Sequence, residues 1–135
     1  MSDPAMILLL TLLLAAPPPM QDVMVVVVNP ANPASRLTAD QVAQYFLGRS
    51  NRLTPLDLPG ASPLRALFYQ QVAGKDADQV KAIWSKIVFT GRGFPPREYG
   101  SNAELRRAVA SNPDAIGYLP QDAVDATVKV VLVVP

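Results

Sequence analysis

The chain of 135 residues contains no cysteine and no histidine. The lack of cysteine excludes disulfide bonds, thiolate chemistry and attachment to a membrane through a lipidated N-terminal cysteine. The lack of histidine removes the commonest metal ligand and the usual general base of hydrolytic triads. The 11 acidic residues form no cluster with metal-ligand spacing. We therefore expect a protein that is not an enzyme and that needs no cofactor or metal ion.

The chain also lacks an excess of charge of either sign. It carries 12 lysines and arginines against 11 acidic residues, a net charge of +1, and the two signs are interspersed. Such a balance creates no field that would hold nucleic acid or a membrane surface non-specifically. No nucleic-acid partner is expected, and any affinity for an anion must come from a local arrangement of groups.

Long hydrophobic runs are scarce, and the densest one is Met6–Ala16 near the N-terminus. Its length is typical of the core of a secretory signal and is too short for a comfortable membrane span. We predict that residues 1–22 are a signal peptide and that the protein is exported to the periplasm. An uncleaved N-terminal anchor is the alternative, because residues 1–5 contain no lysine or arginine and Pro17 follows the small residues. Residues 23–135 have the length of a single domain.

Apolar strands alternate with amphipathic helices in residues 23–135. Residues 23–28 are an uninterrupted β-branched run, which predicts a strand buried on both faces. Helical periodicity, capping residues, glycines and prolines predict the other boundaries. The expected elements are helices at 38–48, 62–74, 76–88 and 101–111 and strands at 23–28, 52–58, 115–119 and 127–134. This order favours the α/β class, with a small mixed, mostly parallel sheet and helices on both faces.

Ser62 is the leading candidate for a binding residue. It precedes Pro63 at a predicted helix start, where unpaired backbone N–H groups and the positive end of the helix dipole favour an anion. Arg65 lies on the first helical turn and could fold its guanidinium back toward the same anion. The alternatives are that Ser62 only caps its helix and that Arg65 is a solvated surface residue.

Residues 89–97 contain two glycines and two adjacent prolines, which predict a shaped loop. Thr90, Gly91, Arg92 and Gly93 combine a hydroxyl, a charge and a backbone that can approach a ligand closely. An anion could be held between this loop and the helix start at Ser62. The alternative is that Gly91 ends the preceding helix in the left-handed conformation.

Three segments in this order resemble the phosphate-type periplasmic solute-binding proteins of ABC transporters. They are residues 60–65 (Gly-Ala-Ser-Pro-Leu-Arg), 89–93 (Phe-Thr-Gly-Arg-Gly) and 112–118 (Asn-Pro-Asp-Ala-Ile-Gly-Tyr), and the likeness runs from about Val25 to Val134. The resemblance implies the fold of one lobe of a type II periplasmic binding protein. Where the family typically has Ser-Gly-Thr, this chain has Ser-Pro-Leu, so the resemblance implies fewer donors for the anion.

The resemblance therefore implies an exported, non-catalytic protein that binds phosphate or a similar oxyanion, with the length for one of the family's two lobes. One lobe cannot enclose an anion and exclude water, so we expect micromolar affinity or weaker unless a homodimer or a partner supplies the missing wall. The alternative is an interaction module that has lost solute binding and docks on an envelope or transporter partner.

Overall fold

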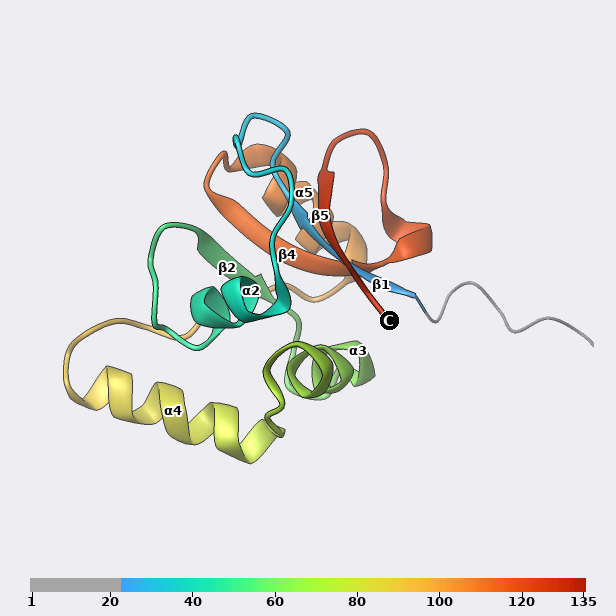
Figure 1. The fold of residues 1–135 in the computed structure, drawn as a ribbon. Coiled ribbons are helices and arrows are strands. Elements are labelled where there is room, and N and C mark those ends of the chain that lie inside the picture. The colour runs from blue at the N-terminus through green and yellow to red at the C-terminus, as the bar shows by residue number, and fades with distance from the viewer. Residues whose placement is uncertain (1–22) are drawn as a thin grey trace, which may run out of the picture.

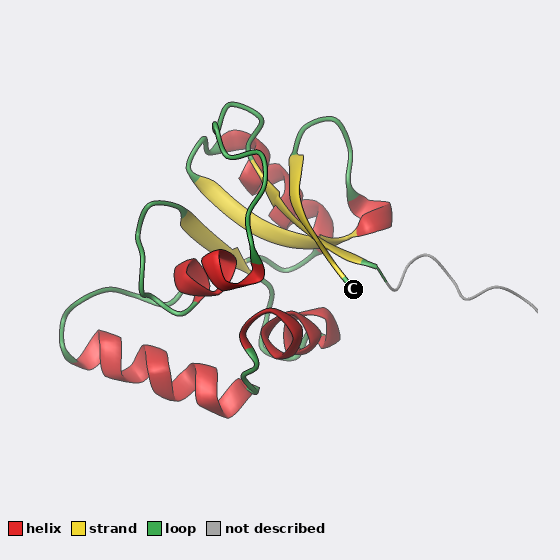
Figure 2. Ribbon diagram, in the orientation of Figure 1, coloured by secondary structure: helices red, strands yellow, loops and turns green. Residues whose placement is uncertain are grey.

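The structure is a computed structural model that describes residues 23–135. The predicted signal peptide lies outside these residues. The elements follow in chain order as β1 (Met24–Val28), α2 (Ala39–Phe46), β2 (Thr54–Asp57), α3 (Pro63–Phe68), the π-helical turn η2 (Tyr69–Ala73), α4 (Ala77–Phe89), β3 (Arg97–Glu98), α5 (Asn102–Ser111), β4 (Ala115–Pro120), the 3-10 turn η3 (Gln121–Ala123) and β5 (Lys129–Val134). Figure 1 shows their arrangement, and Figure 2 shows the helices set around one sheet.

The sheet has five strands in the order β3-β2-β4-β1-β5. Strand β2 pairs in parallel with β3 and β4, whereas β1 pairs antiparallel with β4 and β5. Four strands therefore run in one direction and only β1 opposes them. This confirms the prediction of a mixed, mostly parallel sheet.

Helices cover both faces of the sheet, as neighbouring residues of β4 show. Side chains of successive strand residues point to opposite faces. The Tyr118 ring packs on Phe46 of α2 and Phe68 of α3. A Cβ added at Gly117 would lie 3.1 Å from Val109 of α5, so this glycine faces the opposite layer. The predicted two-sided covering is confirmed, with α2 and α3 on one face and α5 on the other (Figure 1).

The core contains the apolar strands and an aromatic cluster. All five residues of β1 are buried, as its β-branched sequence predicts for a strand between two neighbours. The rings of Phe68 and Tyr118 stack with centroids 4.0 Å apart, and Phe46 meets both rings edge-on. Such pairs add stabilisation beyond the area that they bury. This cluster connects α2 and α3 to β4.

Local signals set most helix boundaries where the sequence predicts them. Thr38 and Asp76 each form a capping box with the glutamine three residues later. Gly74, with φ +65°, ends the helical stretch that begins at Pro63. Two short elements were not predicted: residues 121–123 form the turn η3, and the end of the 89–97 loop forms the two-residue strand β3 beside β2. So short a strand has no periodicity, and its backbone pairing depends on a tertiary neighbour.

Trp84 anchors helix α4 to the rest of the domain. Its side chain is buried, as predicted, and its indole nitrogen donates a hydrogen bond to the carbonyl of Phe46 at 2.9 Å. Gly48 makes this approach feasible. Its φ is +74°, and a Cβ there would lie 2.5 Å from Ile87 and 2.9 Å from Trp84. Within residues 23–135, no helix combines the length and apolar character needed to cross a bilayer.

Candidate functional site

Ser62 begins α3 as predicted, and the turn before it is open to solvent. Its hydroxyl oxygen accepts a hydrogen bond from the Arg65 amide at 3.3 Å, and its own amide donates to the carbonyl of Pro59. Ser62 therefore caps α3. The hydroxyl hydrogen is still available as a donor, because the cap uses only an oxygen lone pair. Gly60, Ala61 and Pro63 are exposed around it.

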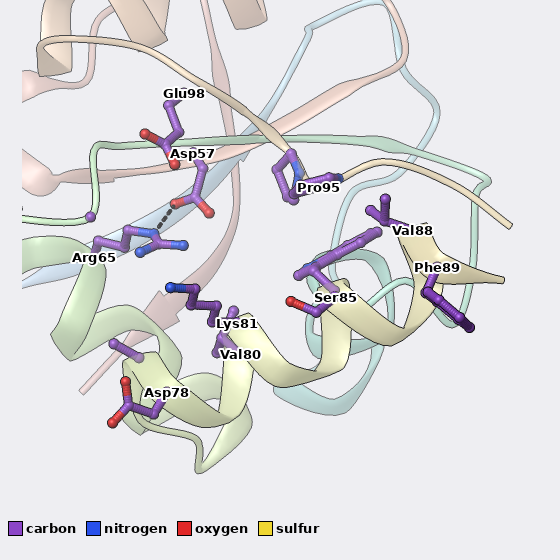
Figure 3. Close-up of a pocket in the computed structure, with 14 residues that line it drawn as sticks. Asp57, Arg65, Asp78, Val80, Lys81, Ser85, Val88, Phe89, Pro95 and Glu98 are labelled. Carbon is purple, nitrogen blue, oxygen red and sulfur yellow. Dashed lines mark ion pairs between the residues drawn. The ribbon is translucent and has the colours of Figure 1, made fainter. Parts of the chain in front are cut away.

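Arg65 has a partner that the sequence did not predict. Its Nε lies 3.3 Å from Oδ1 of Asp57, the last residue of β2, in an ion pair that lacks hydrogen-bond geometry. The Arg65 side chain is 19% exposed and that of Asp57 is 1% exposed. An ideal Cβ on Gly60 would lie 3.6 Å from Nη1 of Arg65, so the guanidinium folds back over the turn. Figure 3 shows Arg65 directed at Asp57, with Glu98 beside them.

Asp57 is the centre of a buried polar network. It accepts hydrogen bonds from the hydroxyls of Tyr69, at 2.6 Å, and Tyr118, and from the amide of Leu58 at 2.9 Å. Burial, and then the Asp57 charge, raise the pKa of both tyrosines far above the usual value. Burial lowers the pKa of Arg65, but the interactions with Asp57, Tyr69 and Tyr118 together outweigh this effect, so the pKa is raised overall. The network holds the arginine in one place.

This network borders a cavity of about 640 Å³, here called the first cavity, between α4 and the carboxyl ends of β2 and β3. Ligands in open α/β sheets bind beyond such strand ends. Lys81 and Ser85 of α4 reach into the same space (Figure 3). The charged residues of the lining are Asp57, Asp78, Glu98, Arg65 and Lys81. The first cavity is thus not a basic site, and its other lining residues are mainly apolar.

The predicted glycine-rich loop borders a different cavity, here called the second cavity, of about 550 Å³. Arg92 and Gly93 line it, and Arg92 donates from Nε to the hydroxyl of Thr90 at 3.0 Å. Gly91 has φ +71° just after Thr90, the residue that caps the end of α4, so it ends the helix in the left-handed conformation, as the alternative proposed. The two predicted groups are therefore not brought together: Arg65 borders the first cavity, whereas Arg92 and Gly93 border the second.

The site residues predicted from the sequence do not include Asp57 and Lys81, which line the first cavity. Asp57 stands between Leu56 and Leu58 in a segment of weak alternation. Its position at the end of an apolar strand is the one sequence signal that could have identified it as a site residue, because a carboxylate that is buried there needs polar or charged partners. Lys81 looks like any solvated helix lysine. Within residues 23–135, no group of three or more acidic side chains could hold a metal ion.

Comparisons with solved structures show the same fold in phosphate-type binding proteins. A protein from Clostridium perfringens, described as a phosphate ABC transporter substrate-binding protein and solved with bound phosphate, matches with a TM-score of 0.66 and 19% identity, over 80% of this chain and 43% of its own. An ABC-type phosphate transport receptor from Vibrio cholerae matches with a TM-score of 0.62 and 20% identity, over 80% of this chain and 44% of the receptor. PstS from Borrelia burgdorferi matches with a TM-score of 0.61 and 11% identity, over 81% of this chain and 46% of PstS.

The chain therefore has the fold of phosphate-type periplasmic binding proteins, as its sequence resemblance implies, and it spans less than half the length of the solved structures that it matches. No model of a known protein family and no curated protein matches the sequence.

Proposed function

We propose that this protein is an exported, non-catalytic lobe that binds phosphate or a similar oxyanion weakly at the turn before α3. The observation that carries the proposal is the placement of Arg65: buried Asp57 holds it at the carboxyl end of β2, with its guanidinium folded over Gly60. The shared fold supports it, because the neighbour from Clostridium perfringens was solved with phosphate bound.

The proposed donors are the terminal nitrogens of Arg65, the hydroxyl of Ser62 and the exposed backbone at Gly60 and Ala61. The pairing with Asp57 engages Nε and leaves the fork of the guanidinium for an anion, which favours two parallel hydrogen bonds to oxygen. Lys81 adds a positive charge at the rim. Thr90 to Gly93 of the predicted site belong to the neighbouring loop and take no part in this binding mode.

The acidic residues of the first cavity bear on which oxyanion fits. Glu98 is exposed and pairs in register with Asp57 across β2 and β3. Phosphate and arsenate carry a proton at neutral pH and can donate it to a carboxylate, whereas sulfate carries none and is repelled. The proposed site therefore prefers a protonated oxyanion. Its openness and its acidic residues keep the binding free energy at about 8 kcal/mol or less.

Calorimetric titration with phosphate, arsenate and sulfate tests this proposal. We expect binding of phosphate and arsenate in the micromolar range or weaker, and much weaker binding of sulfate.

Arg65→Lys, which keeps the charge but loses the forked guanidinium, is expected to weaken phosphate binding roughly tenfold. Lys81→Gln is expected to weaken it about two- to fivefold. Lys86→Gln is the matched control, because Lys86 is exposed on the same helix outside both cavities. The absence of heat with all three anions at millimolar concentration would contradict the proposal.

A second candidate function is docking on an envelope or transporter partner, and exposed aromatic side chains favour it. Phe89, the last residue of α4, is 92% exposed, and Phe94, in the loop between α4 and β3, is 84% exposed. Large exposed aromatics of this kind are typical anchors of protein interfaces. A homodimer through the same loop is a further arrangement that could supply the missing wall.

Capture of partners from envelope extracts tests this candidate. We expect a partner that is retained by the wild-type protein and by Arg65→Lys but lost by Phe89→Ser with Phe94→Ser, because truncating two anchors removes most of the interface energy. Val133→Ser is the control, since Val133 is 56% exposed on β5. Equal retention by the double variant would exclude docking through this loop.

A further inference from the structure

The second cavity has a charge that distinguishes it from the first. Three arginines line it, namely Arg49, Arg92 and Arg97, and no acidic residue does. Within residues 23–135, none of the three guanidinium groups lies within ion-pair distance of a carboxylate, whereas Arg65 and Arg106 are both paired. Arginine stays protonated at any ordinary pH. The second cavity therefore holds three positive charges without a fixed counter-charge.

The fold places these arginines by local rules. Arg49 directly follows Gly48, and Arg92 directly follows Gly91, and both glycines have positive φ at the end of a helix. Arg97 begins β3, which is held beside β2. The carboxyl ends of α2 and α4 contribute at most about half a negative charge each. These partial charges leave most of the positive charge of the three arginines uncompensated.

The guanidinium groups are also partly held in position by neutral groups. Arg92 donates to the hydroxyl of Thr90, and the guanidinium carbon of Arg97 lies 5.3 Å from the centre of the Tyr99 ring. These contacts restrain the side chains without neutralising them, because a hydroxyl and an aromatic ring carry no net charge. A restrained arginine loses less conformational entropy when it binds an anion.

Most of the other lining residues are apolar or aromatic, among them Tyr45, Trp84, Ile87, Phe94, Pro95 and Pro96, and three are polar but uncharged, namely Ser50, Asn51 and Thr54. A volume of about 550 Å³ lies within the range of sites for small organic ligands. Inorganic phosphate alone would contact the arginines but would leave this apolar wall exposed to solvent. The exposed ring of Phe94 could cover a ligand body that rests against Trp84 and the two prolines.

We propose that the second cavity is a binding site for an organic phosphate monoester, with the dianionic phosphate on Arg49, Arg92 and Arg97 and the organic body against the apolar wall. Trp84, Pro95 and Pro96 line both cavities, but the arginines of this site lie outside the first cavity, so the proposed site does not depend on the oxyanion site at Ser62. The ligand chemistry is shared by soluble phosphate esters and by the phosphatidic acid headgroup.

An NMR titration of isotope-labelled protein at pH 8 tests the site, because the ester is then a dianion. The probe is phenyl phosphate, and phenol and inorganic phosphate are the comparison ligands. We expect shifts at residues 49–54 and 92–97, including the side-chain Nε–H of Arg92, and affinity at least tenfold higher than that of inorganic phosphate at the same residues. Binding should weaken as salt is added, because the charges are exposed.

The variant Arg49→Gln with Arg97→Gln should weaken phenyl phosphate binding roughly tenfold. Arg107→Gln, an exposed arginine on α5, should leave it unchanged. If vesicles that contain phosphatidic acid capture the wild-type protein but not the double variant, the natural ligand is the lipid headgroup. If the vesicles do not capture the wild-type protein although it binds phenyl phosphate, the natural ligand is a soluble ester. The proposal is overturned if phenyl phosphate shifts the protein no more than phenol does, if it shifts only residues 60–65, or if the double variant binds as the control does.

Discussion

Asp57→Asn is expected to lower the free energy of unfolding by about 3–5 kcal/mol. The carboxylate is 1% exposed and receives the ion pair from Arg65, two tyrosine hydroxyls and the amide of Leu58. An asparagine side chain has one acceptor oxygen and presents an NH₂ group to the remaining donors. It also leaves the Arg65 charge without its partner. Unsatisfied buried groups of this kind account for the largest effects of single substitutions.

Urea unfolding followed by Trp84 fluorescence and by circular dichroism measures this loss. The melting temperature should fall by at least about 10 °C in a domain of this size. Asp78→Asn is the matched control, since Asp78 lines the same first cavity but is exposed on the first turn of α4. Its loss should cost less than about 1 kcal/mol. Equal destabilisation by the two variants would show that the Asp57 network contributes no more than a surface charge.

At alkaline pH, we expect stability to fall steeply once the pH rises above about 10. Tyr69 and Tyr118 have pKa values raised far above normal in the folded protein, first by burial and then by the charge of Asp57. In the unfolded chain both ionise near pH 10. Below that pH the two states bind the same protons at these groups. Above it the unfolded chain releases protons that the folded chain retains, so unfolding is favoured.

The expected slope is up to about 2.7 kcal/mol per pH unit for the two tyrosines together. Denaturant unfolding at a series of pH values between 8 and 12 measures it, and absorbance near 295 nm shows whether the two phenols ionise only as the protein unfolds. Tyr69→Phe should reduce the slope by about half, whatever it does to stability at neutral pH. An unchanged slope in that variant would contradict the assignment.

Both predictions concern a network that no reading of the sequence identified. Asp57 and Tyr118 are separated by 61 positions, and they meet because β2 pairs in parallel with β4. The sequence predicts that Arg65 faces an anion or solvent, and the structure adds Asp57 as its partner. Its place on the first turn of a helix could be predicted from Ser62 and Pro63, but its contact could not.

For the glycine-rich segment, too, the local structure could be predicted from the sequence, whereas the tertiary contacts could not. Gly91 as a helix end follows from local chain geometry, and the structure has it there. Whether the loop faces the Ser62 turn or another surface depends on how α4 lies against α2, which Trp84 and Gly48 determine. The loop faces the second cavity, where Arg92 and the nearby Arg97 meet Arg49 from a distant part of the chain.

The sequence by itself determined where helices begin and end, which strand is buried on both faces, and the α/β class, because capping, proline, glycine and side-chain periodicity act within a few residues. It also carried the order of motifs that matches the fold of phosphate-type binding proteins. The tertiary structure alone decided the strand order, the opposed direction of β1, the burial of Asp57 and the separation of two cavities. These depend on contacts between residues far apart in the chain, whose energies exist only after the sheet has formed.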